Sequence, residues 1–184
     1  MTVNPELICD VHRYIEKHSP DLGRNFVIAR SWLSSSALGN IEAFDGLFAL
    51  RDFKEGECIC KYEGVIIKSA DAFRMPVHLK GYLMRLGPQC YVDTRPCPLI
   101  AARYINDCIN PAGWNVRFDK QPQADPPCAQ VVSLRDIKAG EEFFVEYGRW
   151  YWAGCSSTIK PVRISFSDLH ARRQAVESAS FVSR

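Results

Sequence analysis

The sequence predicts a β-rich α+β fold built around one hydrophobic core. Short runs rich in Val, Ile, Phe and Tyr recur along the chain, and Gly and Pro residues separate them, as in small sheets with tight connections. Long stretches with helical periodicity are rare. The 184 residues are enough for one domain with a substantial core and a small appendage.

The N-terminal segment, residues 1–40, is predicted to be a helical extension. Asn4 can cap the helix, and Pro5 suits its first position. Apolar residues follow at helical spacing: Leu7, Ile8, Val11, Tyr14 and Ile15. Pro20 ends the helix, and residues 25–32 are compatible with either a strand or a helix.

The central segment, residues 41–154, holds the predicted strands. Residues 47–50 and 58–62 flank a polar turn, so they predict one hairpin. Residues 82–86 and 90–93 flank a Gly-Pro turn and predict another. Both pairings rest on the turn between the two runs, because strands that follow one another along the chain usually lie side by side.

A third hairpin is predicted near the end of the central segment. Residues 131–134 favour a strand, a polar connection ending in Gly follows, and residues 143–147 form another β-favouring run. Side chains alternate along a strand, so Phe143, Val145 and Tyr147 would share one face. That strand would end in a phenol beside a cluster of aromatic residues.

Short helices and one loop complete the central segment. Ser69 is expected to cap a helix over residues 70–74. Residues 99–104 can form one or two helical turns, and residues 121–127 contain three prolines and predict a surface loop.

Residues 155–184 are predicted to be a C-terminal tail or helix. The Ser-Asp pair at residues 167–168 can cap a helix that runs to about residue 177, with Leu169 and Val176 as its few apolar contacts. The sequence leaves open whether this helix is a solvated appendage or closes a binding groove.

Charge and hydropathy argue against several classes of partner. The net charge of +2 is too small to indicate a nucleic-acid surface. No apolar run approaches the ~20 residues that span a bilayer, and the N-terminus lacks a basic segment followed by an apolar one. We therefore expect no direct nucleic-acid contact, no membrane span and no secretory signal.

The eight cysteines favour reduced thiols over a metal site. They are scattered without a Cys-x-x-Cys pair, and Cys58 and Cys60 together are a poor zinc ligand set. A disulfide framework is possible, but a chain of this length does not need one. We expect mostly buried, reduced thiols and no bound metal.

Four short motifs follow one another along the central segment. They are Asp45-Gly46-Leu47-Phe48-Ala49, Lys61-Tyr62-Glu63-Gly64, Arg103-Tyr104-Ile105-Asn106-Asp107-Cys108, and Gly140-Glu141-Glu142-Phe143-Phe144-Val145-Glu146-Tyr147-Gly148. In this order they resemble the Gly-rich opening, the Tyr-x-Gly, the Asn-containing segment and the closing tyrosine segment of the SET domain. The resemblance covers roughly residues 44–154. Each motif is weak alone, but the ordered set is specific.

The resemblance implies a fold of small curved sheets around a knot-like crossing, where the Asn106 segment passes beneath the loop closed by the Tyr147 segment. It also implies an S-adenosyl-L-methionine-dependent protein lysine N-methyltransferase, with a histone tail as the commonest substrate of the family. The family's habit places such a protein on chromatin in the nucleus, and the cytoplasm is also compatible with the sequence.

The alternative is a catalytically inactive SET-like module that binds a protein or peptide partner. Two departures from the family pattern favour this alternative. The usual Gly before Asp45 is absent, and Asp107 replaces a His. The presence of both Asn106 and Tyr147 favours the enzyme, because an inactive copy would be free to lose them.

The resemblance assigns the catalytic role to two tyrosines. Tyr147 matches the closing tyrosine, which positions the methyl group and the amine, and Tyr82 lies where family members often place another channel tyrosine. Both could instead be hydrogen-bonded core residues. Tyr62 more readily shapes the cofactor pocket or the core.

Cofactor contacts are implied in the same way. The candidate residues are Gly46, Leu47, Phe48, Arg103, Asn106, Asp107, Tyr147 and Trp152. Gly46 lets the backbone approach a ligand closely. Arg103 could serve the cofactor or the structure, and Trp152 could stack on adenine or only pack the C-terminal segment.

A lysine must lose its proton before it can accept a methyl group, and at pH 7 this costs roughly 4–5 kcal/mol. A dry aromatic channel near a cation lowers this cost. The candidate channel residues are Tyr82, Phe118, Val145 and Tyr147. The small Val145 favours a channel that permits more than one methylation. The substrate peptide would lie beside residues 82–86.

Overall fold

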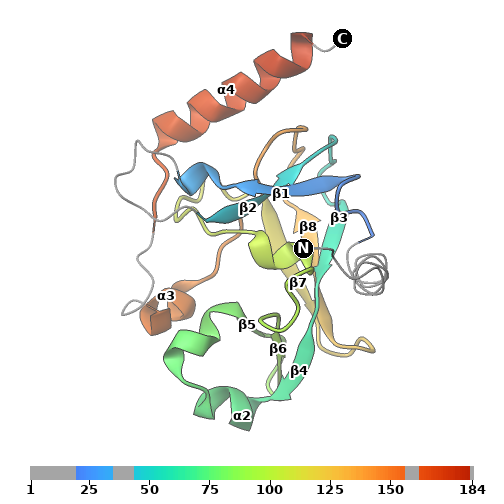
Figure 1. Cartoon of the computed structure of the whole chain (residues 1–184), viewed down its shortest axis with the longest axis vertical. Helices are drawn as coiled ribbons and strands as arrows, with labels where there is room; N and C mark the ends of the chain where they lie inside the picture. Colours follow the sequence, from blue (N-terminus) through green and yellow to red (C-terminus); the bar gives the residue numbers. More distant parts are fainter. Residues whose placement is uncertain (1–19, 35–43, 156–161, 183–184) are drawn as a thin grey trace, which may run out of the picture.

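The computed structural model describes residues 20–34, 44–155 and 162–182, so the predicted N-terminal helix lies outside the described residues. Three small antiparallel sheets follow one another along the long axis of the protein (Figure 1). They confirm the predicted β-rich α+β class. No helix in this described part is both long and apolar enough to cross a membrane.

The first sheet pairs β1 (Phe26–Arg30) with β2 (Asp45–Ala49). The segment whose structure the sequence left ambiguous is therefore a strand, and the 3-10 turn η1 (Trp32–Ser34) follows it. The second edge of β2 meets the closing segment, because the Phe143 amide donates to the Leu47 carbonyl at 2.8 Å.

The second sheet has the order β3-β8-β7, formed by Cys58–Tyr62, Cys128–Ser133 and Val116–Gln121. The predicted pairing of 47–50 with 58–62 is wrong, because β2 pairs with β1 and β3 pairs with β8.

The predicted hairpin of 131–134 with 143–147 is also wrong. Both edges of β8 are occupied by β3 and β7. The closing segment instead bonds to three other parts of the chain, and the amides of Phe143, Phe144 and Val145 donate to Leu47, Asn115 and Asn106, respectively.

The third sheet has the order β4-β6-β5, formed by Val65–Lys68, Cys90–Asp93 and Leu83–Arg85. The pairing of β5 with β6 confirms the hairpin predicted around the Gly-Pro turn. Because β6 is central, β5 is an edge strand.

Short helices connect these strands. α2 (Ser69–Arg74) forms where a helix was predicted, but the cap is different, because Lys68 is the N-cap residue and the Ser69 hydroxyl donates to the Pro88 carbonyl at 2.9 Å. The 3-10 helix η3 (Val77–Tyr82) follows and ends at Tyr82, immediately before β5. A further 3-10 helix, η4 (Ala101–Tyr104), confirms the predicted helical turns.

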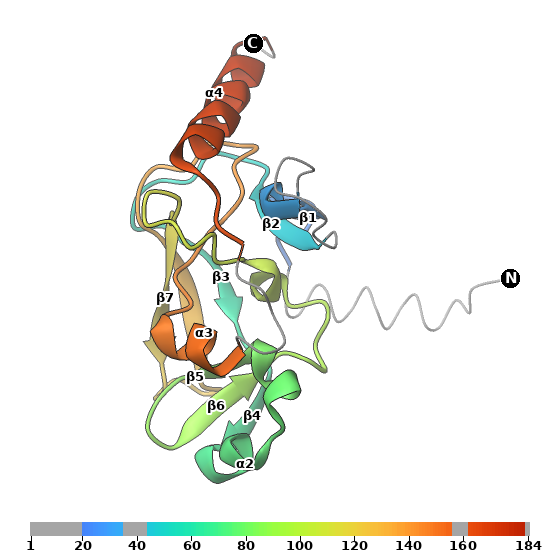
Figure 2. The same cartoon turned by 90° about the vertical axis from the view of Figure 1, so that its left-hand side faces the viewer.

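Two helices follow the closing segment (Figure 2). α3 (Arg149–Cys155) packs beside η3, whereas α4 (Phe166–Val182) lies at the end of the molecule opposite α2 in both views. α4 is longer than predicted, and Leu169 is only 1% exposed. The helix is therefore fixed to the body of the protein.

Two apolar clusters form the interior. The main core comprises Phe26, Leu47, Ala49, Phe53, Ile59, Tyr62, Leu86, Val92, Cys97, Ile100, Ala101, Ala102, Ile105, Val116, Ala129, Val131, Ile137, Phe143 and Val145. The second core comprises Leu33, Cys108, Phe144, Ile164 and Leu169. The second core joins residues from all three predicted segments of the chain. Six cysteines have described side chains, all of them free thiols, and three of the six are buried.

The expected crossing of the chain is present between the two cores. Asn106 and Phe144 form a parallel bridge, and the Val145 amide donates to the Asn106 carbonyl at 3.0 Å. Buried Asn115 also binds the closing segment. Its side-chain amide donates to the Glu142 carbonyl and accepts from the Phe144 amide, both at 2.8 Å. These bonds bring the third and fourth motifs together.

Candidate active site

Hydrogen bonds also join the first motif to the third. Asn106 Nδ2 donates to the Asp45 carbonyl at 2.9 Å, so the asparagine lies beside Gly46. Its own carbonyl is bonded to Val145. Three motifs that are distant in the sequence therefore meet around Asn106.

Tyr147 lies at the end of this meeting point and is partly buried. Its hydroxyl donates to the Ile105 carbonyl at 2.8 Å. Its ring lies 4.5 Å from that of Tyr151 and 6.0 Å from that of Trp152, between centroids. Burial, followed by the phenols of Tyr151 and Tyr62, raises the pKa of Tyr147 well above its usual value, so the group is a neutral phenol.

Tyr82 is 42% exposed and lies at the end of η3 rather than in a strand. The Arg103 guanidinium lies 4.4 Å from the centre of its ring. The Tyr62 hydroxyl donates to the Tyr82 carbonyl at 3.0 Å, and burial raises the pKa of Tyr62 to about 12. Arg103 therefore stacks on the second candidate tyrosine and also donates to the Thr94 carbonyl at 3.3 Å.

The other predicted channel residues lie at the main core. Val145 is 2% exposed, and Phe118 packs edge-on against Tyr62 with 5.4 Å between ring centroids. Phe118 and Tyr147 both pack against the main core. Phe118, Val145 and Tyr147 thus share one cluster, whereas the exposed Tyr82 is not part of it.

Leu47 and Phe48 lie in β2 with little freedom to meet a ligand. Leu47 is fully buried, and its carbonyl accepts from the Phe143 amide. Phe48 packs edge-on against Trp32 with 5.9 Å between centroids. The contact of the first motif with the third is made instead by the Asp45 carbonyl, which accepts from Asn106.

Asp107 is 5% exposed and accepts four hydrogen bonds. Its Oδ1 accepts from the Ile109 amide at 2.8 Å and from Trp114 Nε1 at 2.9 Å. Its Oδ2 accepts from the Tyr147 amide at 3.0 Å and from Trp152 Nε1 at 2.9 Å. The carboxylate that replaces the family's histidine thus joins both candidate aromatic residues to the third motif.

Glu142 is a residue of this site that sequence reasoning missed. It is fully buried, and its carboxylate accepts from the Ser31 hydroxyl and the Trp32 amide, each at 2.6 Å, and from Asn106 Nδ2 at 3.3 Å. A Cβ placed on Gly46 would overlap its Oε1. Gly46 is therefore needed for the close approach of this side chain, whatever it does for a ligand.

Burial raises the pKa of Glu142 to about 7, although its hydrogen bonds to Ser31 and Trp32 lower it in part. The available signal in the sequence was a carboxylate immediately before the apolar run of residues 143–145, since a carboxylate must find partners when buried. Trp114 was missed as well, because only the fold brings its indole to Asp107.

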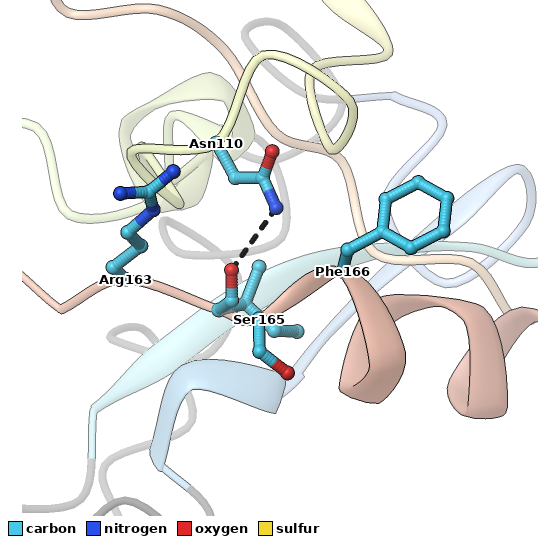
Figure 3. A pocket seen from close by; sticks show the side chains of 5 residues that line it. Asn110, Arg163, Ser165 and Phe166 are labelled. Atoms are coloured by element: carbon cyan, nitrogen blue, oxygen red, sulfur yellow. Dashed lines mark hydrogen bonds between the residues drawn. The ribbon is translucent and has the colours of Figure 1, made fainter.

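Two cavities lie near the third motif. The first, about 280 Å³, is lined by Asp107, Ile109, Pro111, Trp114, Glu146, Gly148, Arg149 and Trp152. The second, about 380 Å³, is open and lies where Asn110 Nδ2 donates to the Ile164 carbonyl at 3.0 Å (Figure 3). Arg163 extends on one side of the second cavity and Phe166 points to the other.

Acids near the third sheet differ in their availability for a charged ligand. Asp93 is 4% exposed and lies 2.6 Å from Arg95, so it is already paired. Asp71 lies 3.8 Å from Arg74 and is largely exposed. Within residues 20–34, 44–155 and 162–182, no three His, Cys, Asp or Glu side chains are grouped to hold a metal ion.

A sequence profile of the SET domain matches residues 45–148. The match spans more than half of the 184 residues, so the chain belongs to the SET-domain family, which includes most protein lysine methyltransferases. A search of curated proteins finds no match.

Solved structures share this fold. A humanized mutant of the Chaetomium thermophilum Polycomb Repressive Complex 2 bound to the inhibitor GSK126 is 30% identical, with a TM-score of 0.50. The same kind of complex bound to the inhibitor GSK343 is 28% identical, also with a TM-score of 0.50. Each comparison covers 67% of this chain but only 15% of the other chain.

Proposed function

We propose that the chain is an S-adenosyl-L-methionine-dependent protein lysine N-methyltransferase that acts on histone tails. The observation that carries the proposal is the meeting of Asn106, Tyr147 and the Gly46 motif in a SET-domain chain. In the family these segments hold the cofactor and the reacting lysine. Family habit also leads us to propose a nuclear, chromatin-associated location.

The cavity beside Asp107 supports a site for a flat aromatic group such as adenine. Two indoles, Trp114 and Trp152, line it together with Asp107. The chain neighbour of Asp107, Asn106, donates to the Asp45 carbonyl of the first motif. When bound, S-adenosyl-L-methionine supplies a methyl group carried on a sulfonium. We assign Asn106, Trp152 and the backbone of Asp107 to holding it.

Tyr147 is suited to orienting a lysine amine. A hydroxyl can donate one hydrogen bond and accept two. The Tyr147 hydroxyl donates to the Ile105 carbonyl, so its oxygen remains available as an acceptor. Accepting a hydrogen bond from the amine N–H would direct the nitrogen lone pair away from the phenol and fix the line of attack.

The surroundings support a neutral lysine. Aromatic side chains exclude water from the lysine stem, and a nearby cation disfavours the ammonium form. Arg103, held against the Tyr82 ring, supplies a cation beside the proposed channel. This arrangement would reduce the free-energy cost of deprotonating the lysine, which is roughly 4–5 kcal/mol at pH 7 in water.

The edge of the third sheet supports a peptide groove. β5 is an edge strand, so its outer amides and carbonyls can pair with an extended peptide. Tyr82 immediately precedes β5, which would bring a lysine of the added strand near the tyrosine pair.

The decisive experiment measures transfer of labelled methyl groups to core histones and lysine peptides by the wild-type chain and Tyr147→Phe. We expect label on lysine and a loss of about 100-fold or more in the variant. Tyr91→Phe is the matched control, because its ring packs against Phe73 away from the motifs. It should retain activity within about twofold.

Calorimetry with S-adenosyl-L-methionine separates the two functional classes. No label on any substrate, together with no cofactor binding, would overturn the proposed enzyme and favour the inactive binding module. Equal activity of the wild type and Tyr147→Phe would overturn the role of Tyr147 alone.

A further inference from the structure

The Asp107 carboxylate connects three parts of the chain. It receives donors from its own loop through Ile109 and Trp114, from the closing segment through the Tyr147 amide, and from α3 through Trp152. All four distances lie between 2.8 and 3.0 Å, and Asp107 itself is buried. Each oxygen has two donors.

A carboxylate is the side chain that this arrangement requires. An ionised aspartate accepts through both oxygens, whereas an asparagine presents an oxygen on one side and two donors on the other. A neutral histidine accepts through one nitrogen only. Neither could satisfy four N–H donors at once, so the aspartate at position 107 fits its donors closely, although the family usually has a histidine there.

The loop after Asp107 shows what the carboxylate holds in place. Ile109 has a φ of +49°, in the left-handed region that β-branched residues rarely adopt. Its amide is the one that donates to Oδ1 of Asp107. The hydrogen bond therefore helps to hold a strained residue that lines the 280 Å³ cavity.

Two further residues that line the cavity depend on the same carboxylate. Trp152 donates to Oδ2 while its ring stacks on Tyr147, with an interplanar angle of 26°. Trp114 donates to Oδ1 and also lines the cavity. One carboxylate thus fixes both indoles and the backbone of Tyr147.

We propose that Asp107 is the positioning residue of this site: its carboxylate sets the spacing of the Trp114 and Trp152 indoles and ties α3 to the backbone of Tyr147. The wall of the cofactor cavity and the placement of the phenol then depend on one group. The consequence for cofactor binding and catalysis rests on the function proposed above. The coupling between Asp107 and Trp152 does not, because it is present in the chain without any ligand.

The test is a double-mutant cycle with Asp107→Asn, Trp152→Phe and the double variant. The first readout is the near-ultraviolet circular dichroism and tryptophan fluorescence of the chain without ligand. The second is the Kd for S-adenosyl-L-methionine, and the third is kcat and KM for the peptide that receives the methyl group. Two controls are Trp150→Phe, which changes an indole that is 77% exposed, and Glu141→Gln, which changes another buried acid.

Asp107→Asn should raise the Kd about tenfold or more, the scale of losing hydrogen bonds to a charged group, and should lower kcat more than it raises the KM for the peptide. The double variant should lose little beyond Asp107→Asn, because Trp152→Phe removes a donor that is already unmatched. Both controls should stay within about twofold of the wild type.

Additive effects of Asp107→Asn and Trp152→Phe on the spectra and on the Kd would overturn the proposal, as would an Asp107→Asn variant that keeps both Kd and kcat within about twofold. If Asp107→Asn does not fold, Trp152→Phe and Trp114→Phe are used in its place, because each removes one donor to the carboxylate. An unchanged Kd in both variants would overturn the proposal. If the wild type binds no cofactor, the proposed function fails while the spectra still decide the coupling.

Discussion

Two neighbouring glutamates of the closing segment are both buried but have opposite surroundings. Glu141 is 4% exposed and lies 2.7 Å from Arg135 and 3.4 Å from Arg173 of α4. Glu142 is fully buried and accepts hydrogen bonds from Ser31, Trp32 and Asn106, none of which carries a charge.

The closing segment therefore has two different faces: a structural face that carries Glu141 and a titratable face that carries Glu142. Successive side chains of an extended chain point to opposite sides, so the two carboxylates cannot share partners. Glu141 fastens α4 and the loop at Arg135 through opposite charges. Glu142, buried without a cation in hydrogen-bonding contact, has a pKa raised to about 7 and lies against Asn106 of the candidate site.

The largest expected effect is a pH dependence of stability that belongs to Glu142. Its folded pKa of about 7 exceeds the ordinary value of 4.5, so the folded state binds the additional proton. This stabilisation is fully present below pH ~4.5 and is lost as the pH rises to ~7, a change of up to about 3 kcal/mol. Chemical unfolding at several pH values should show wild type losing stability relative to Glu142→Gln over this window.

Ser31→Ala provides the second variant. It removes a donor that lowers the pKa of Glu142, so the loss of stability should extend to higher pH. A free-energy difference between wild type and Glu142→Gln that is the same at pH 5 and pH 8 would contradict the titration of Glu142.

The close approach of Gly46 to Glu142 gives the next largest effect. A Cβ at Gly46 would overlap Oε1 of Glu142, which is itself fixed by three hydrogen bonds. Gly46→Ala should therefore reduce the free energy of unfolding by about 2 kcal/mol, the scale of overpacking a core. Urea unfolding measures this change.

Gly154→Ala is its matched control. No described atom lies within 4 Å of a Cβ placed there, and the residue lies in α3. Alanine in a helix should be neutral or stabilising by up to about 1 kcal/mol. Equal effects of the two substitutions would mean that Glu142 does not restrict position 46.

On the structural face, Glu141→Gln should cost about 1.5 kcal/mol, because Arg135 and Arg173 lose a charged partner. Both arginines are partly exposed, so this loss should shrink in high salt. Urea unfolding at 0.05 and 1 M salt tests the assignment, and a loss that is independent of salt would argue against the ion pairs.

The overall fold could be predicted from the order of the motifs, but the strand pairing could not. Local turn patterns paired residues 47–50 with 58–62, whereas the structure pairs β3 (Cys58–Tyr62) with β8 (Cys128–Ser133). The pleat of a strand indicates which side chains share a face, not which distant strand will lie beside it. The hairpin of β5 and β6 was predictable because a short turn joins its strands.

The site shows the same limit. Asn106 and Tyr147 could be assigned from the resemblance, and the structure brings their segments together. The environment of Asp107 could not be assigned, because its donors Trp114 and Trp152 come from segments whose approach depends on the crossing and on α3. A single acid in a motif carries no information about four donors that arrive from three places.

The smallest expected effect compares two adjacent arginines of α4. The charge of Arg172 lowers the pKa of Glu142, and its guanidinium lies 5.7 Å from the centre of the Trp32 ring. Arg172→Gln should therefore cost about 0.5 kcal/mol above pH 7, where Glu142 is ionised, and move the stability loss of the wild type to higher pH. Chemical unfolding of the variants across the same pH series measures both.

Arg173→Gln is the control one residue away. Arg173 pairs with Glu141 and donates to the Ala112 carbonyl at 3.1 Å, so its loss should lower stability without moving the pH window of Glu142. If both variants moved that window equally, the charges of both arginines would act on Glu142. If only Arg172→Gln moves the window, each arginine of α4 acts on a different glutamate. The titration of Glu142 then depends on the side of the closing segment that contacts Asn106.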